Sequence, residues 1–163
     1  MINMKCVWMV SLMIISMTAA GQDSLLQARL KSLQGKIAPF STYAKKDSLI
    51  LICFWSVESE ESITELNSIN LNLAQWQNQV PFRFMAVSAD EGKTTSRFRP
   101  TYNMNGWTFD AYIDLYGDLR RALHSSNVPQ SMIIYKNELI YEQTGWSPGT
   151  ENYMIQRMLS LKH

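Results

Sequence analysis

A run of seven apolar residues, Leu49 to Trp55, constrains the fold of this chain more than any other feature. The run is short, partly β-branched and apolar at every position, which is typical of a strand that is covered on both faces. After this run the spacing of the apolar residues changes. From Ile63 to Trp76 they recur at helical spacing, which predicts a long helix over about residues 59–78. A buried strand that leads into a long helix indicates an α/β sheet.

The rest of the chain alternates between strand and helix in the same way. Downstream we predict a strand over 82–88, a helix over 93–103 with a defect at Pro100, a strand over 109–115, a helix over 117–124, a β-hairpin over 131–143 and a last helix from 148–150 onward. Upstream, residues 22–34 predict a short amphipathic helix, and residues 36–47 predict a connection over the surface. This order predicts an α/β fold with a central mixed β-sheet flanked by helices on both faces.

The first twenty residues show the three-part pattern of a secretory signal peptide. Lys5 supplies the positive charge, residues 6–17 form an apolar stretch, and small residues follow up to Ala20. We predict cleavage near Ala20, because an apolar stretch of twelve residues is short for a bilayer core of about 30 Å. An uncleaved anchor is the alternative. The predicted organisation is a signal peptide over 1–20, an N-terminal helical segment over 21–37 and one domain over 38–163.

The composition excludes several classes of function. Lys and Arg number 15 against 14 Asp and Glu, so the chain lacks the basic excess of a nucleic-acid-binding protein. Two histidines, His124 and His163, and two cysteines are too few for a zinc or haem site. We therefore expect no metal, no cofactor and no nucleic-acid partner. Signal cleavage removes Cys6 and leaves Cys53 as the only thiol, so no intramolecular disulfide can form.

Three local signatures, taken in order, resemble the thioredoxin superfamily and, within it, the TlpA-like thiol-disulfide oxidoreductases of the bacterial envelope. They are the strand that ends in Phe54-Trp55-Ser56, the dipeptide Val128-Pro129 before a hairpin, and Gly145-Trp146 before the last helix. The resemblance covers about residues 38–163. It implies a thioredoxin-like three-layer sandwich and a cis peptide bond between Val128 and Pro129.

The resemblance fails at the residues that carry the chemistry of the family. Ser59 and Ser62 stand at both cysteine positions of the Cys-x-x-Cys motif. Thiol-disulfide exchange needs an attacking thiolate and a resolving thiol, and a serine hydroxyl supplies neither. Glu58, Glu60 and Glu61 at the same helix start would raise the pKa of any thiol placed there. We therefore predict no catalytic residues, a redox-inactive protein that is not an enzyme, and a capping role for Ser59.

The resemblance also implies a binding surface. In active relatives the loop that contains the cis-proline faces the cysteines and offers backbone groups to an extended substrate segment. We expect a protein or an extended peptide to bind here, at a surface lined by Trp55, Val57, Glu58, Glu60, Val128 and Pro129. A place for Trp55 in the core is the alternative. We expect export to the bacterial periplasm, with no membrane span after signal cleavage, and the oligomeric state stays open.

Other functions remain open on the residues alone. A thiol-disulfide oxidoreductase that acts through Cys53 is one, although a thiol within a buried strand is typical of inert packing. Ser59 or Ser62 as a nucleophile would need a base, and the sequence does not place His124 near them. The acidic residues at the helix start, which are Glu58, Glu60, Glu61 and Glu65, either bind calcium or a basic partner or are simply solvated, and solvation is the simpler interpretation.

Overall fold

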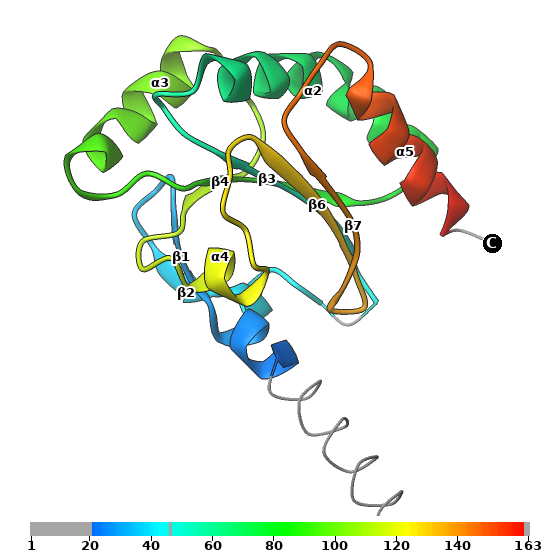
Figure 1. The fold of residues 1–163 in the computed structure, drawn as a ribbon, viewed down its shortest axis with the longest axis horizontal. Helices are drawn as coiled ribbons and strands as arrows, with labels where there is room; N and C mark the ends of the chain where they lie inside the picture. The colour runs from blue at the N-terminus through cyan, green and yellow to red at the C-terminus, as the bar shows by residue number, and fades with distance from the viewer. Residues whose placement is uncertain (1–20, 46, 162–163) are drawn as a thin grey trace, which may run out of the picture.

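The computed structural model describes residues 21–45 and 47–161, which form one mixed sheet with helices on both faces (Figure 1). The predicted signal peptide lies outside the described residues. The sheet order is β2-β1-β5-β4-β3-β6-β7. The strands are β1 (Arg29–Ser32), β2 (Ile37–Pro39), β3 (Leu49–Trp55), β4 (Arg83–Ser88), β5 (Ala111–Ile113), β6 (Gln130–Tyr135) and β7 (Glu138–Thr144). The helices are α2 (Glu60–Gln79), α3 (Phe98–Met104), α4 (Asp118–Ala122) and α5 (Thr150–Ser160), with 3-10 segments η1 (Phe40–Thr42) and η2 (Gly92–Arg97).

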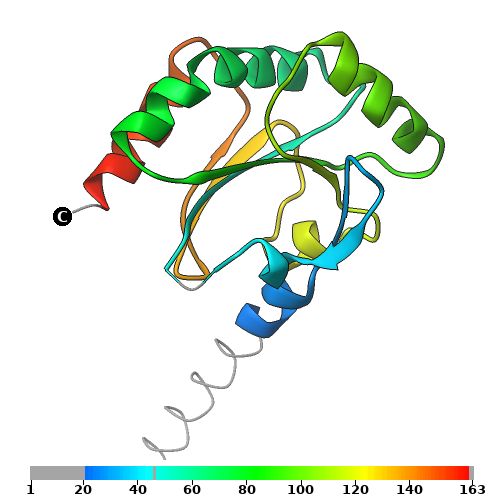
Figure 2. The ribbon, with the colours of Figure 1, turned by 180° about the vertical axis from the view of Figure 1, so that it is seen from behind.

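The two faces of strand β3 pack into two separate hydrophobic cores, one on each side of the sheet. Strands β3, β4 and β5 are parallel, and the strands at both edges of the sheet are antiparallel. Successive side chains of a strand point to opposite faces, so one face of β3 carries Leu51, Cys53 and Trp55, and the other carries Ile50, Ile52 and Phe54. Figure 1 and the view from behind in Figure 2 show α2, α3 and α5 over the first face, with α4 and the N-terminal segment over the second. This arrangement confirms the predicted fold class.

Most predicted elements agree with the structure. The strand predicted from Leu49 to Trp55 is β3, and the long helix is α2 with bounds shifted by one residue. The segment predicted as an interrupted helix divides into η2 and α3. Pro100 lies in the first turn of α3, where a backbone N–H has no partner within the helix.

The helix predicted over residues 22–34 is wrong beyond residue 27. Only residues 21–27 of the described chain are helical there, and the predicted helix and surface connection give way to a hairpin of β1 and β2. The other side of β1 pairs with β5, placing Lys31 opposite Ile113. The predicted boundary between residues 37 and 38 therefore falls inside β2, and the hairpin belongs to the main sheet. In the part of the chain described, no helix has both the length and the apolar character needed to cross a membrane.

Candidate functional site

The candidate site lies at the edge of the sheet where the parallel strands end. Ligands of open α/β sheets bind outside the carboxyl ends of the strands. Helix α2 begins shortly after β3 at this edge. The loop before β6 returns to the same edge, because β6 is antiparallel to β3 and pairs Gln130 with Phe54. The peptide bond between Val128 and Pro129 in this loop is cis. The topology thus brings the start of α2 and the Val128–Pro129 loop together.

A serine side chain caps α2. Ser59 Oγ accepts a hydrogen bond of 3.1 Å from the backbone N–H of Ser62, as the sequence predicts. Ser62 is fully buried, and its hydroxyl has no partner among the residues described. His124 is exposed, and within the same residues no hydrogen bond joins its ring to either serine. Within the described part of the chain, His124 therefore does not serve either serine as the base that a nucleophile needs.

A buried carboxyl group organises the residues just before this cap. Asp90 follows β4 and is 6% exposed. Its oxygens accept hydrogen bonds from the hydroxyls of Ser56 and Ser88, both at 2.7 Å, and from the backbone N–H of Val57 at 3.1 Å. The Ser56 hydroxyl oxygen in turn accepts from the backbone N–H of Glu58 at 3.1 Å. The sequence pattern placed Asp90 in a turn and carried no signal for these contacts, since two of the three partners lie more than 30 residues away.

A second polar cluster lies inside the core next to α2. Cys53 on β3 is the only free thiol among the described residues and is fully buried. Its sulfur lies 3.4 Å from Glu65 Oε2, and the hydroxyl of Ser131 donates a hydrogen bond of 2.8 Å to Glu65 Oε1. Glu65, expected among the solvated acidic residues, is instead 1% exposed. Burial, and then the nearby Glu65 carboxyl, raise the pKa of the Cys53 thiol well above its ordinary value. Such a thiol is a poor nucleophile.

The residues predicted to bind a partner divide into buried and exposed groups. Trp55 is fully buried, and its ring centroid lies 5.8 Å from that of Phe98 and 5.1 Å from that of Trp107. The prediction that its side chain lines a surface is therefore wrong, and the core alternative holds. Of the other predicted residues, the structure exposes Glu58 and Glu60, partly exposes Val128, and buries Val57 and Pro129.

A shallow hollow of about 650 Å³ opens beside the start of α2. Its lining consists of Val57, Glu58, Glu60, Ile63, Thr64 and Arg97. Arg97 Nη1 lies 3.4 Å from Glu58 Oε1, and both side chains are more than half exposed. An exposed ion pair of this kind contributes about 0–1 kcal/mol, so a partner can compete for either charge. Among the described residues no cation pairs with Glu60.

Glu61 has a structural role that distinguishes it from the other acidic residues of this helix start. Its Oε1 accepts a hydrogen bond of 2.6 Å from the backbone N–H of Trp146. The preceding Gly145 has φ of +74°, and its N–H donates to the carbonyl of Pro129 at 2.9 Å. These bonds connect the segment before α5 both to α2 and to the Val128–Pro129 loop.

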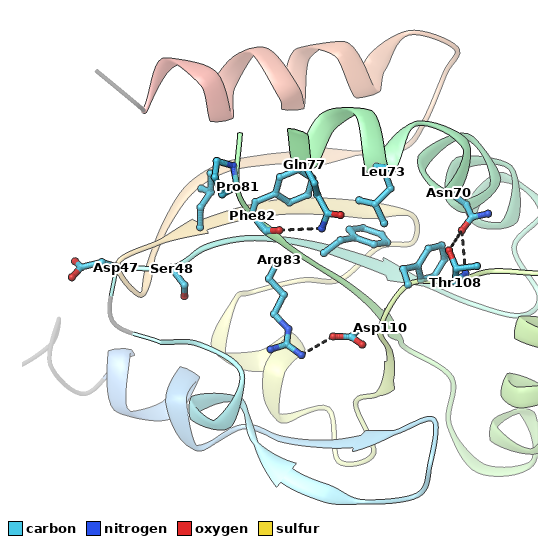
Figure 3. Close-up of a pocket in the computed structure, with 14 residues that line it drawn as sticks. Asp47, Ser48, Asn70, Leu73, Gln77, Pro81, Phe82, Arg83, Thr108 and Asp110 are labelled. Atoms are coloured by element: carbon cyan, nitrogen blue, oxygen red, sulfur yellow. Dashed lines mark hydrogen bonds and ion pairs between the residues drawn. The ribbon is translucent and has the colours of Figure 1, made fainter. Parts of the chain in front are cut away.

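A larger hollow lies at the opposite end of the parallel strands (Figure 3). It measures about 840 Å³ and is bordered by the starts of β3 and β4 and by the second half of α2. Polar groups on its rim bond to one another: Arg83 donates to Asp110 at 2.6 Å, and the backbone N–H of Thr108 donates to Asn70 at 3.2 Å. None of the residues predicted for the site lines this hollow. Within the described residues, no group of His, Cys, Asp and Glu side chains is arranged to hold a metal ion.

Comparison with solved structures identifies the fold. An uncharacterized thioredoxin-like protein from Porphyromonas gingivalis matches with a TM-score of 0.71 and 27% identity, over 85% of this chain and 94% of that one. The fold is thioredoxin-like. Within this fold the resemblance stated from the sequence is supported at the level of the superfamily.

Two more distant structures share the thioredoxin-like fold. A putative thiol:disulfide interchange protein DsbE from Chlorobium tepidum matches with a TM-score of 0.68 and 20% identity, over 81% of this chain and 90% of that one. A secreted disulfide oxidoreductase from Mycobacterium tuberculosis matches with a TM-score of 0.64 and 13% identity, over 85% of this chain and 98% of that one. No family model matches the sequence, and no curated protein matches it.

Proposed function

We propose that this thioredoxin-like protein is exported to the bacterial periplasm, has no thiol-redox activity, and binds an extended segment of another protein at the edge formed by α2 and the Val128–Pro129 loop. One observation carries the proposal. The helix that would present the two cysteines of a thioredoxin-like enzyme starts with Ser59, which serves as its cap, and Ser62, which is buried. By the resemblance, these two serines stand where an active enzyme has its attacking and resolving thiols.

The state of the remaining thiol supports the absence of redox activity. Cys53 is fully buried in the central strand, and its pKa is raised well above the ordinary value by burial first and by Glu65 second. Exchange proceeds through a thiolate that can reach its target, so this thiol lacks both properties. No second thiol lies among the described residues to resolve a mixed disulfide.

The backbone at Val128 supports the binding of an extended segment. Val128 is partly exposed, and its N–H and C=O have no hydrogen-bond partner among the described residues. A strand-like peptide supplies a C=O and an N–H at the spacing that such groups need, as in other cases of β-strand addition. The neighbouring hydrogen bond from Gly145 to Pro129 fixes the loop from its other side.

The charges beside the loop indicate the kind of segment that fits. Glu58 and Glu60 are exposed on the rim of the hollow at α2, and among the described residues Arg97 is the only cation that lines it. A segment with a Lys or Arg near this rim is attracted to the two carboxylates, whereas an acidic segment is repelled by them. We therefore expect a partner whose bound segment carries positive charge.

Two observations of different weight support the proposed export. Residues 1–20 have the pattern of a secretory signal peptide. The Mycobacterium tuberculosis oxidoreductase that shares the fold is described as secreted. The pattern in this chain is the stronger support, because a shared fold at 13% identity does not carry location with it.

Affinity capture of the tagged protein from its native envelope tests the proposal. We expect a partner that is retained in the presence of a reductant, since no disulfide holds it. The double variant Glu58→Arg, Glu60→Arg should lose this partner. The variant Glu138→Arg, Glu142→Arg on the exposed edge strand β7 changes the net charge equally and should keep it. A partner released by reductant, or kept by the first variant, would contradict the proposal.

A thiol-disulfide oxidoreductase is the second candidate function, and the DsbE protein that shares the fold is the observation that favours it. A disulfide-reduction assay on the purified protein separates the two candidates. We expect no activity above that of the Cys53→Ser variant. Activity that Cys53→Ser abolishes would establish the enzyme and exclude the redox-inactive protein.

A further inference from the structure

Three polar side chains meet in the core where three elements join. Cys53 comes from β3, Glu65 from α2 and Ser131 from β6, and none is more than 1% exposed. Ser131 donates a hydrogen bond of 2.8 Å to one carboxyl oxygen of Glu65, and the Cys53 sulfur lies 3.4 Å from the other. The Glu65 carboxyl is therefore the polar link that joins α2 to the two central strands.

In the part of the chain that the structure describes, no cation compensates a negative charge at this position. The groups that act on Glu65 are the thiol of Cys53 on β3, the hydroxyl of Ser131 on β6, and the carboxyl groups of Glu151 on α5 and Glu61 on α2 itself. None of the ion pairs among the described residues includes Glu65. A buried carboxylate without a cation is costly. The carboxyl groups of Glu151 and Glu61 add to this cost, whereas the hydrogen bonds that Ser131 and Cys53 donate offset part of it and lower the pKa of Glu65. Burial, the largest cause, raises the pKa of Glu65 to about 7.

We infer that Glu65 is a proton-dependent latch, which holds α2 against β3 and β6 while it is protonated and favours the opening of α2 once its proton is lost. In the closed form the proton stays on the carboxyl group inside the core. In the open form the carboxyl group is solvated and gives this proton to water or buffer. Opening also exposes Cys53, because α2 lies over the face of β3 to which Cys53 points.

The release of one proton determines the pH dependence of the latch. Between the ordinary pKa of a glutamic acid and the raised value in the closed form, the ratio of open to closed protein should rise up to tenfold for each pH unit. Above the raised value both forms have lost the proton, and the ratio becomes constant. The latch operates whether or not the neighbouring face binds a peptide.

The reactivity of Cys53 reports the opening. The full chain with Cys6→Ser is treated with a disulfide reagent such as 4,4′-dithiodipyridine from about pH 4.5 to about pH 8.5. Each labelling rate is divided by the rate of the denatured protein at the same pH, which removes the titration of the thiol itself. We expect the normalised rate to rise by at least tenfold and then to level off near neutral pH.

Two further variants separate the latch from general acid-base effects. Glu65→Gln is neutral at every pH, so its normalised rate should not change with pH. Glu142→Gln removes an exposed carboxyl group on β7 and should behave like the parent protein. A parent rate that does not vary with pH would overturn the inference, as would the same slope in Glu65→Gln. If Glu65→Gln does not fold, Ser131→Ala takes its place: it removes a hydrogen bond that lowers the pKa of Glu65, so its rate should level off at a higher pH than that of the parent protein, and an unchanged profile would overturn the inference.

Discussion

The Ser56 hydroxyl donates a hydrogen bond of 2.7 Å to Asp90, and this contact joins the end of β3 to the end of β4 immediately before α2. The same carboxyl group accepts from the buried N–H of Val57 and from Ser88. Three donors, two from the loop after β3 and one from the last residue of β4, thus depend on one side chain. The geometry at the start of α2 is therefore set from a loop distant in the sequence.

Replacement of Asp90 by alanine should reduce the free energy of unfolding by about 2–4 kcal/mol, because buried donors left without an acceptor cost about 1–3 kcal/mol each. Urea denaturation followed by circular dichroism measures the change. Glu91→Ala is the matched control, since it removes the adjacent acidic residue and an exposed ion pair with Arg120, and should cost less than about 1 kcal/mol. Equal losses in the two variants would show that Asp90 has no special role.

The cap of α2 gives a smaller and more local prediction. Ser59→Ala removes the acceptor of the Ser62 N–H and should cost about 1 kcal/mol of unfolding free energy. Ser59→Asp provides another good acceptor at the cap position and should recover most of the loss. The same denaturation experiment measures both variants. An alanine variant as stable as the parent protein would mean that the capping bond contributes nothing.

The buried carboxyl group of Glu65 predicts an unusual dependence of stability on pH. Its pKa is raised to about 7 in the folded protein, so between about pH 4.5 and pH 7 the folded state keeps a proton that the unfolded state has lost. The contribution of Glu65 to stability is therefore largest at low pH and falls as the pH rises through this window, by about 3 kcal/mol in total. Above about pH 7 it changes no further.

Subtraction isolates this contribution from that of other groups. The difference in unfolding free energy between the parent protein and Glu65→Gln, measured by urea denaturation at several pH values, should decline from about pH 4.5 to about pH 7. The parent protein minus Glu142→Gln should give a flat line. A difference for Glu65 that increases with pH would have the wrong sign and would contradict a raised pKa.

The elements nearest the site were predictable because their signals are local. The apolar run that forms β3 and the helical period of α2 are contained in single windows of sequence. The same helical period also indicates that the Glu65 side chain is buried, although we expected Glu65 among the solvated acidic residues at the helix start. Glu65 and Trp76 are eleven positions apart and lie on the same side of an ideal helix, so a buried Trp76 predicts an inward Glu65.

Other features depend on contacts between distant segments and had no local signal. β1 is a strand because it pairs with β2 and β5, although its Leu30 also fits the helical spacing of the leucines around it. Asp90 is a structural acceptor because β4 ends beside β3. Trp55 belongs to the core because Phe98 and Trp107 cover it from a separate part of the chain. Each outcome is decided by packing between elements, which overrides local pattern.

Site-specific photo-crosslinking from Val128 tests the central claim most directly. A photoreactive amino acid is placed at Val128 in one variant and at Tyr153, an exposed residue of α5, in another, and both are irradiated in the native envelope. We predict a defined partner crosslinked from Val128 and not from Tyr153, in the same yield when Cys53→Ser is added. No crosslink from Val128, or one that requires Cys53, would contradict a binding protein that works at this edge without thiol chemistry.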